Sequence, residues 1–366
     1  MINIVYLINH LRNTGPTRVL LDICKYLDRS IYNPIIISLR GEHSSQSIKC
    51  EFEALGIEIV EYKYNFWQLE FLPGLVSKRL VKQFSQYDNV IYHAHGYHPN
   101  LVLSRMHKPT TVTTLHCISG EDFVMNKGPL LGGYMSIRYR ANIQHIAHPI
   151  VISQYMKSYY SNVCNHLQAI TNGVDFKCNC SQDITKYKEH IGQANEYVVL
   201  VNGNLCKRKN QSFIINELKN TTVGFRCIFL GDGPMMLEYK RLVGNDPRFE
   251  FKGHVFNVPD YINAADVVIS ASLSEGMPLA VLETINMGCP ILLSNIPPHA
   301  EICNNMNNLG VHLFECKDGE LATLFERVRL SHEDRKAIAE QAHKTYSAET
   351  MSQKYQELYS EIVYRA

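Results

Sequence analysis

Ser274-Glu275-Gly276-Met277-Pro278-Leu279-Ala280-Val281-Leu282-Glu283 is the most informative stretch of the chain. It follows the apolar run Val267–Ser270, which is typical of a buried parallel strand. Pro278 stands where a helix would begin, since proline is tolerated in a first turn, and Gly288 would end that helix. The stretch is therefore predicted to join a strand to a helix, which is the repeating unit of an α/β fold.

The same junction has the chemistry of an anion-binding site. The backbone N–H groups between Gly276 and Leu279 lie at the positive end of the predicted helix, which suits phosphate or sugar oxygens. Gly276 also lets a ligand approach the backbone closely. Phosphate alone does not explain two nearby carboxylates, Glu275 and Glu283, whereas sugar and ribose hydroxyls do. The alternative to a binding site is that this stretch only caps the helix and that one glutamate is solvated.

Outward from this stretch, short apolar runs alternate with helical segments such as Thr17–Leu27, which predicts parallel sheets covered by helices. The Asn-Gly turn in Thr171-Asn172-Gly173-Val174-Asp175 separates two such series. We therefore expect two Rossmann-like domains, residues 1–170 and 171–345, followed by an amphipathic helix within 346–366. The predicted strands are Ile2–Ile8, Pro34–Leu39, Val90–His93, Thr111–Leu115, Tyr197–Val201, Cys227–Leu230, Phe249–Lys252, Val267–Ser270 and Pro290–Leu293.

The composition excludes several classes of protein. The 366 residues are 45% hydrophobic and 19% charged, as in an ordinary soluble globular protein. The 36 basic and 35 acidic side chains argue against nucleic acid as the main partner. No leader peptide is visible, and no stretch approaches the ~20 apolar residues of a membrane helix. The eleven cysteines include no C-x-x-C pair, so a metal cluster is not expected.

Glu275 and Glu283, with seven residues between them, resemble the E-x7-E motif of glycosyltransferase family 4, the retaining enzymes of GT-B fold. The resemblance covers almost the whole chain, because further motifs follow in the family's order. It implies two Rossmann-like domains with a donor cleft between them, and a tail helix that crosses back onto the N-terminal domain. The further motifs are His93-Ala94-His95-Gly96, Thr114-Leu115-His116, Asn172-Gly173-Val174-Asp175, Gly231-Asp232-Gly233-Pro234, Phe251-Lys252-Gly253 and the run that begins at Asp266.

The resemblance also implies roles for individual residues. Glu283 would bind the donor ribose and Glu275 the donor sugar. The backbone of Gly276-Met277-Pro278-Leu279 would lie at the donor and supply N–H groups from Gly276, Met277 and Leu279. Lys209, in Gly203-Asn204-Leu205-Cys206-Lys207-Arg208-Lys209-Asn210, matches the lysine that holds the donor diphosphate. A fixed cation there would stabilise the charge that grows on the leaving group.

Asn204 departs from the family, which usually has arginine at this position. Lys207 or Arg208 could supply the second cation, although a solvated basic loop explains these two side chains equally well. In the N-terminal half, Gly15 resembles the family's glycine-rich loop at the donor phosphates. Taken alone, its segment is a strand-to-helix turn with Thr17 as a candidate cap.

Two histidines at predicted strand ends are candidates for the site. His116 is expected to contact the donor sugar, because open α/β sheets bind ligands at the carboxyl ends of their strands. The alternative for this residue is a hydrogen-bonded structural histidine. His95 is expected to order the cleft.

The resemblance implies a retaining hexosyl- or N-acetylhexosaminyltransferase that uses a nucleoside-diphosphate sugar. The acceptor would be a glycan or a polyprenyl-diphosphate-linked oligosaccharide in the synthesis of bacterial surface polysaccharide, such as O-antigen or capsule. No Asp-x-Asp triplet is present, so neither a metal nor a cofactor is expected. We expect the protein in the cytoplasm, at the inner face of the membrane. Lys78, Arg79 and Lys82 then mark a candidate membrane-facing helix, the alternative being a solvated helix with a buried apolar face.

Three other functions stay open at the level of sequence. A GT-B epimerase of the UDP-N-acetylglucosamine 2-epimerase kind would share the cleft but need no acceptor. A non-catalytic sugar-nucleotide-binding subunit would explain Asn204, although Glu275, Glu283 and Lys209 are intact. A nicotinamide-dependent dehydrogenase would need the G-x-G-x-x-G fingerprint, which the chain lacks.

Overall fold

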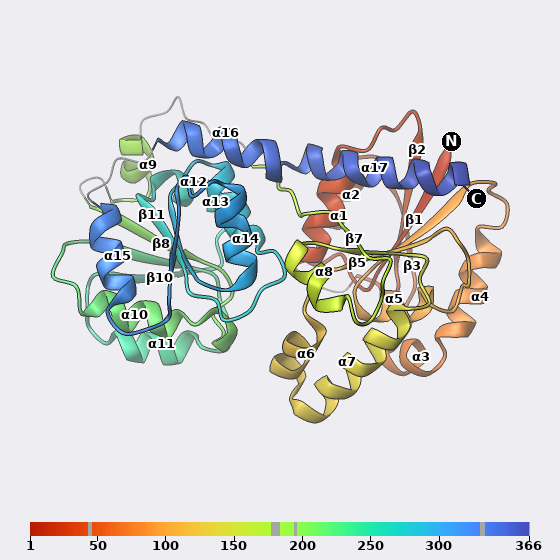
Figure 1. Ribbon diagram of the computed structural model, residues 1–366, viewed down its shortest axis with the longest axis horizontal. Coiled ribbons are helices and arrows are strands. Elements are labelled where there is room, and N and C mark those ends of the chain that lie inside the picture. The colour runs from red at the N-terminus through yellow and green to blue at the C-terminus, as the bar shows by residue number, and fades with distance from the viewer. Residues whose placement is uncertain (43–45, 177–183, 194–195, 330–333, 366) are drawn as a thin grey trace. The chain divides into compact units, whose positions relative to one another are not determined.

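The computed structural model describes residues 1–42, 46–176, 184–193, 196–329 and 334–365, and it divides into two compact units (Figure 1). The N-terminal unit comprises Met1–Gly173 together with the tail, Ala348–Ala366, and the C-terminal unit comprises Val174–Ser347. The first boundary falls within the Asn-Gly turn segment, beside the limit of 170 expected from the sequence.

The N-terminal unit is a parallel sheet of seven strands in the order β3-β2-β1-β4-β5-β6-β7. All seven residues of β1 are buried, because helices cover both faces of the sheet. The strands are β1 Ile2–Ile8, β2 Tyr32–Ser38, β3 Glu58–Glu61, β4 Val90–His95, β5 Thr111–Leu115, β6 His148–Val151 and β7 Gln168–Ala169. The helices are α1 Gly15–Lys25, α2 Lys49–Ala54, α3 Phe66–Phe71, α4 Pro73–Gln83, α5 Tyr97–Leu103, α6 Ser119–Lys127, α7 Pro129–Ile143, α8 Gln154–Tyr160 and α17 Ala348–Arg365.

The tail helix α17 packs against α1 (Figure 1). Ser352 Oγ donates a hydrogen bond to the carbonyl of Ile23, and Gln356 Nε2 donates to the carbonyl of Tyr26. The apolar side chains that the amphipathic pattern placed on one face of this helix are buried, namely Met351, Tyr355, Leu358, Tyr359 and Ile362.

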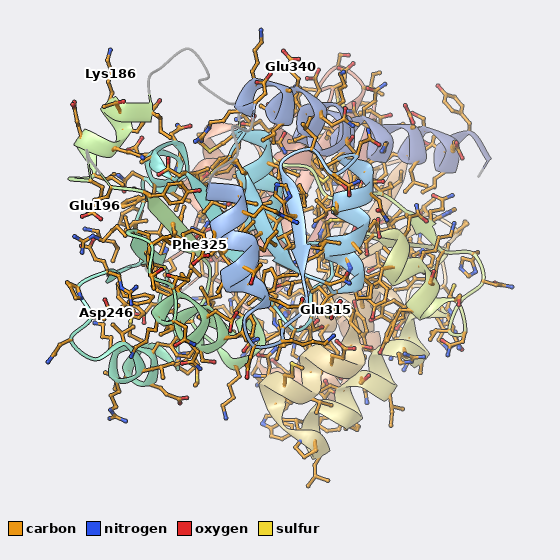
Figure 2. All side chains as sticks on the ribbon, turned by 60° about the vertical axis from the view of Figure 1, so that its left-hand side comes forward. Lys186, Glu196, Asp246, Glu315, Phe325 and Glu340 are labelled. Atoms are coloured by element: carbon orange, nitrogen blue, oxygen red, sulfur yellow. The ribbon has the colours of Figure 1, made fainter. Side chains whose placement is uncertain are left out.

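The C-terminal unit is a parallel sheet of six strands in the order β10-β9-β8-β11-β12-β13. Phe325, in the helix Glu320–Arg329 (Figure 2), is buried in the core with its ring edge-on to Tyr197 and Phe225. The strands are β8 Val198–Asn202, β9 Arg226–Leu230, β10 Phe249–Gly253, β11 Val267–Ser270, β12 Ile291–Ser294 and β13 Val311–Phe314. The helices are α9 Ile184–His190, η1 Lys207–Lys209, α10 Gln211–Lys219, α11 Met236–Val243, α12 Val258–Ala264, α13 Leu279–Asn286, α14 Pro297–Asn305, α15 Glu320–Arg329 and α16 Arg335–Tyr346.

Two expectations from the sequence need correction or refinement. Helix α1 begins at Gly15, and Thr14 takes the N-cap position, so the prediction of Thr17 as the cap is wrong. In α4, Leu80 and Phe84 are buried in the core while Leu75 is exposed, so most of the apolar face of this helix points inward.

Within the part of the chain that the structure describes, no helix combines the length and the apolar character needed to cross a membrane.

Candidate active site

The candidate site of the C-terminal unit lies where the strand order reverses. From β8 the chain first adds β9 and β10 on one side, and it then returns to the other side of β8 with β11. At such a switch point the loops that follow the two central strands diverge and leave a crevice for a ligand. Here the loop after β8 carries Lys209, and the loop after β11 carries Glu275. The N–H of Leu273 donates to the carbonyl of Arg208 at 2.8 Å and joins the two loops.

Glu275 is the centre of this site, because it is buried and holds two cations. Its Oε1 lies 2.6 Å from Lys209 Nζ, and its Oε2 lies 2.7 Å from Arg208 Nη1. Burial alone would raise the pKa of Glu275, but Lys209 and Arg208 outweigh burial and lower this pKa to about 2. Glu275 is therefore a carboxylate at every physiological pH.

Arg208 is one of the two basic residues considered as a second cation in view of Asn204. Arg208 stands beside Lys209 at Glu275, and it also donates to the carbonyl of Ser274 at 2.5 Å. Asn204 is exposed, and its backbone carbonyl accepts a hydrogen bond from Gln211 Nε2 at 2.9 Å. Lys207 is exposed. Of the two alternative cations considered from the sequence, Arg208 is the one that the structure places at Glu275.

Glycines let the loops after β8 and β9 approach each other. A Cβ on Gly231 would collide with the carbonyl oxygen of Gly203, and one on Gly233 would collide with the carbonyl oxygen of Leu205. The backbone of Gly231 also has a φ of +115°, which side chains rarely allow. A Cβ on Gly203 would make only ordinary contact with Lys209, so what favours glycine there is its φ of +143°. The two loops therefore lie in direct backbone contact beside the lysine.

Helix α13 begins as the sequence indicates. Pro278 is its N-cap residue, and the carbonyl of Pro278 accepts from the N–H groups of Val281 and Leu282 at 3.1 and 3.2 Å. Gly276, Met277 and Pro278 are buried at the N-terminal end of the helix, and Leu279 is half-buried. Glu283 is half-buried in the second turn.

The sequence analysis missed His299, a buried residue of α14 close to Glu275. Its Nδ1 donates to the carbonyl of Ser294 at 2.9 Å, which leaves Nε2 as an acceptor in the neutral ring. Among the described residues this buried Nε2 has no hydrogen-bond partner. Burial lowers the pKa of His299 to about 4, despite the opposing effect of the Glu275 carboxylate. The only signal in the sequence was that His299 follows β12, whose carboxyl end lies at the same edge as that of β11.

The N-terminal unit has its own cluster of histidines, at the ends of β4 and β5. His95 Nδ1 lies 2.9 Å from His116 Nε2, so one ring donates to the other. Burial is the main cause that lowers the pKa of His95 well below its ordinary value, and burial lowers that of His116 to about 3. Both rings are neutral at pH 7. Gly15 lies in the same unit, as the first residue of α1.

His93 connects this cluster to the tail helix. Its Nδ1 lies 2.6 Å from the hydroxyl of Tyr359 in α17, and its Nε2 lies 2.8 Å from Thr114 Oγ1. The Thr114 hydroxyl also lies 2.8 Å from the hydroxyl of Tyr355. The strand-end motifs His93-Ala94-His95-Gly96 and Thr114-Leu115-His116 therefore form one hydrogen-bonded layer, which α17 completes.

Two models of protein families match the chain. The model described as Glycosyltransferase Family 4 matches residues 13–177, and the model described as Glycosyl transferases group 1 matches residues 196–329. The first match lies in the N-terminal unit except for its last few residues, and the second includes Lys209, Glu275 and Glu283.

Two relatives from Escherichia coli match different shares of the chain. An enzyme named UDP-Gal:alpha-D-GlcNAc-diphosphoundecaprenol alpha-1,3-galactosyltransferase is 30% identical over 165 residues, which is 42% of this chain and 42% of that enzyme. This chain thus spans less than half of that relative. The O-antigen biosynthesis glycosyltransferase WclY is 21% identical over 98% of both chains.

Solved structures with the same fold match the chain over nearly all its length. The HepE protein of Anabaena, solved with UDP and glucose, is 19% identical, with a TM-score of 0.78 over 98% of this chain and 100% of that one. The sucrose-phosphate synthase of Thermosynechococcus elongatus is 14% identical, with a TM-score of 0.80 over the whole of both chains.

Proposed function

Because the chain belongs to glycosyltransferase family 4 and has the GT-B fold, we propose that it transfers a sugar from a UDP-sugar to a lipid-linked glycan. The acceptor is a glycan on polyprenyl diphosphate, and the product is a bacterial surface polysaccharide. UDP is favoured because the galactosyltransferase named above takes UDP-galactose and HepE was solved with UDP. The acceptor class follows the diphosphoundecaprenol in that enzyme's name and the O-antigen role of WclY.

The observation that carries this proposal is the pairing of Glu275 with both Lys209 and Arg208 at the strand switch point. Two cations against one carboxylate leave a net positive charge at the junction before α13. The N-terminal end of that helix adds its own partial positive charge. A leaving UDP gains negative charge as the glycosidic bond breaks, so a fixed positive site stabilises the transition state more than the ground state.

Glu275 orients groups in this mechanism and does not transfer protons. A carboxyl group with a pKa of about 2 carries no proton to donate at pH 7. Because both of its oxygens are held by cations, it is also a weak nucleophile. It can still accept hydrogen bonds from sugar hydroxyls while it holds Lys209 and Arg208 in place. Glu283, farther along α13, binds the ribose hydroxyls.

Because Lys209 and Arg208 hold both oxygens of Glu275, this carboxylate acts neither as nucleophile nor as base, and the reaction retains the configuration of the donor. UDP departs with both electrons of the C1–O bond, and the acceptor oxygen forms its bond to C1 on the face that UDP leaves. A diphosphate oxygen takes the acceptor's proton. Lys209 and Arg208 supply the charge that a divalent ion provides in other transferases, so no metal is needed.

We assign acceptor binding to the N-terminal unit, in which a sugar hydroxyl has a candidate partner in His116. At pH 7 this ring is neutral, so it offers a sugar hydroxyl one hydrogen-bonding nitrogen rather than a charge. Its other nitrogen, Nε2, is already engaged by His95. His95 therefore fixes which nitrogen of His116 is available.

Isothermal titration of the purified protein with UDP-, GDP- and TDP-sugars tests the donor assignment. We expect binding of a UDP-sugar that is unchanged by EDTA. Incubation of that donor with a polyprenyl-diphosphate-linked glycan should then yield UDP and a lengthened glycan. Conversion of the donor sugar without any acceptor would indicate an epimerase. Loss of activity on chelation, restored by Mn²⁺ or Mg²⁺, would contradict the metal-free mechanism.

A further inference from the structure

The N-terminal unit exposes large apolar side chains on two helices far from each other in sequence. Trp67 in α3 is 65% exposed, and Leu130 and Ile137 in α7 are 90% and 74% exposed. Single exposed apolar residues are ordinary on protein surfaces, but a cluster of this size marks an interaction site. The full set, called the apolar surface below, is Trp67, Phe71, Leu72 and Leu75 from α3 and the start of α4, with Leu130, Leu131, Tyr134 and Ile137 from α7.

Buried polar contacts join α3 and α7 into one surface. Glu70 in α3 is 1% exposed, and its Oε1 lies 3.1 Å from Arg138 Nε in α7. The hydroxyl of Tyr134 donates to the same oxygen at 3.0 Å. Figure 1 shows α3, α6 and α7 together at one end of this unit. The apolar side chains on either side of this ion pair are therefore held in fixed relation to one another.

Helix α7 is apolar on two faces, which is unusual for a surface helix. Met135, Tyr139 and Ile143 point into the unit and are buried. Leu130 and Ile137 lie on the outer side of the same helix and are exposed. The buried side chains of the inner face pack α7 against the unit. The exposed apolar side chains of the outer face make no such contribution, so packing within this unit does not explain them.

The charges around the apolar surface are mainly positive. Segments 62–87 and 119–143, which include α3, α4, α6 and α7, contain three carboxylates, namely Glu70, which is buried against Arg138, and Glu121 and Asp122 in the first turn of α6. The same segments contain seven basic residues, namely Lys63, Lys78, Arg79, Lys82, Lys127, Arg138 and Arg140. The chain as a whole has 36 basic and 35 acidic residues, so this excess is local.

From these observations we propose that the apolar surface is the face by which the protein binds an anionic phospholipid bilayer. Aromatic and aliphatic side chains enter the interface between headgroups and acyl chains, while the basic rim meets the negative headgroups. A second copy of the chain fits poorly, because a twofold contact would place the same basic rims against each other. This proposal goes beyond the proposed function, since membrane binding requires no particular donor or acceptor.

Helix α4 contributes to the basic rim. Lys78, Arg79 and Lys82 are exposed on it, while Leu80 and Phe84 are buried. The basic residues singled out from the sequence therefore supply charge beside the apolar surface. The side chains that enter the bilayer lie mainly on α3 and α7. The basic residues that indicated α4 in the sequence did not indicate these two helices.

Trp67 is the single tryptophan of the chain, so its fluorescence reports directly on this surface. Full-length protein is titrated with vesicles of phosphatidylcholine, alone or mixed equally with phosphatidylglycerol, without nucleotide sugar or acceptor. We expect a shift of the emission to shorter wavelength and co-flotation with the anionic vesicles, both weaker at high salt. Absence of both at every salt concentration would overturn the proposal.

The paired variant Leu130→Ser with Ile137→Ser should weaken vesicle binding at least about tenfold, because each side chain loses apolar burial in the interface. The matched control is Leu237→Ser with Phe256→Ser, which removes two exposed apolar side chains of the C-terminal unit and should leave binding unchanged. Equal binding by the first variant and the wild type would overturn the proposal.

Sedimentation of the protein without lipid tests the other possible occupant of the apolar surface, a second copy of the chain. A wild-type dimer that the Leu130→Ser and Ile137→Ser changes convert to monomer would assign the surface to a second copy and overturn the bilayer assignment. Titration with a UDP-sugar is unaffected in either case, so failure of the membrane proposal is distinguishable from failure of the proposed function.

Discussion

At the scale of single residues, the candidate site is one buried carboxylate in contact with two cations, and the sequence predicted only part of it. The E-x7-E spacing identified Glu275 and Glu283 as candidates, and the resemblance of the loop at residues 203–210 identified Lys209. Neither could show that Glu275 lies within 2.7 Å of both Lys209 and Arg208, because that geometry depends on how two loops pack. The approach of His299 in α14 to Glu275 also depends on tertiary packing.

Lys209→Ala should weaken the binding of UDP by ~1.5–3 kcal/mol, the typical value for a hydrogen bond to a charged group. The loss arises because Lys209 supplies one of the two cations next to the buried Glu275. The matched control is Lys207→Ala, which removes an exposed lysine from the same short helix and should leave binding within about twofold of wild type. Calorimetric titration with UDP measures both. If both variants lost the same binding free energy, the basic loop would attract UDP only through its overall positive charge, and Lys209 would have no specific role.

The buried His98 should make the N-terminal unit sensitive to acid. Burial lowers the pKa of His98 to about 4, from an ordinary value of 6.5. The unfolded chain therefore binds a proton between pH 6.5 and 4 that the folded chain excludes, so stability falls as the pH falls through this window. His98→Gln should reduce the slope of unfolding free energy against pH by about 1.4 kcal/mol per pH unit.

Urea denaturation at several pH values between 7 and 4.5 measures this slope. His145→Gln, at an exposed position of the same unit, is the control. An unchanged slope in His98→Gln would show that the folded protein accommodates the protonated ring.

At the scale of elements, the sequence predicts most central strands but misses four short strands. Ile2–Ile8, Thr111–Leu115 and Val267–Ser270 are strands with the expected limits, because apolar runs covered on both faces leave little ambiguity. The edge strands Glu58–Glu61, Gln168–Ala169 and Val311–Phe314 were missed, and so was His148–Val151 inside the first sheet. None of these strands is longer than four residues, so each gives only a short apolar pattern.

The outer faces of α3 and α7 were missed for a different reason. An apolar pattern does not distinguish a side chain packed in a core from one left exposed for a partner. Trp67 and Ile137 look like core residues until the packing of the inner faces is known. Exposure is a property of tertiary structure, and local sequence does not encode it.

Helix α17 should depend on its buried hydrogen bonds to the sheet. The hydroxyl of Tyr359 lies 2.6 Å from His93 Nδ1 and 3.2 Å from the hydroxyl of Tyr6. Tyr359→Phe leaves the buried His93 nitrogen without this partner and should lower the free energy of unfolding by about 1–3 kcal/mol. Tyr364→Phe, at an exposed position of the same helix, should cost far less.

Equilibrium denaturation followed by circular dichroism compares the two variants. Equal stability of Tyr359→Phe and Tyr364→Phe would mean that α17 is held by apolar packing alone.

At the scale of the whole molecule, the two units repeat one plan. Each is a parallel sheet whose chain adds two strands on one side of the first strand and then continues on the other side. The strand between the two directions is β1 in one unit and β8 in the other, and candidate residues follow the switch in both. This repeat was predictable from the alternation of apolar runs and helices. The chemistry of each unit was not, since it rests on loop residues.

The anomeric outcome of the reaction tests the site as a whole. Inversion needs a base behind the anomeric carbon to activate the acceptor hydroxyl. Double displacement needs a free nucleophile on that side. Glu275 suits neither role, because its pKa is about 2 and Lys209 and Arg208 hold its two oxygens.

A route that needs neither group lets the leaving diphosphate accept the proton while the acceptor enters on the same face. An α-linked UDP-sugar should therefore give an α-glycoside. The coupling constant between H1 and H2 in the proton NMR spectrum of the product decides this for a gluco- or galacto-configured sugar. The same analysis of the Glu275→Gln product separates two roles for this carboxylate. If Glu275 only orients the cations and the sugar, the variant is slower but still gives the α product. A β-linked product from the wild-type enzyme would require a base that the present assignment lacks, and it would overturn the mechanism.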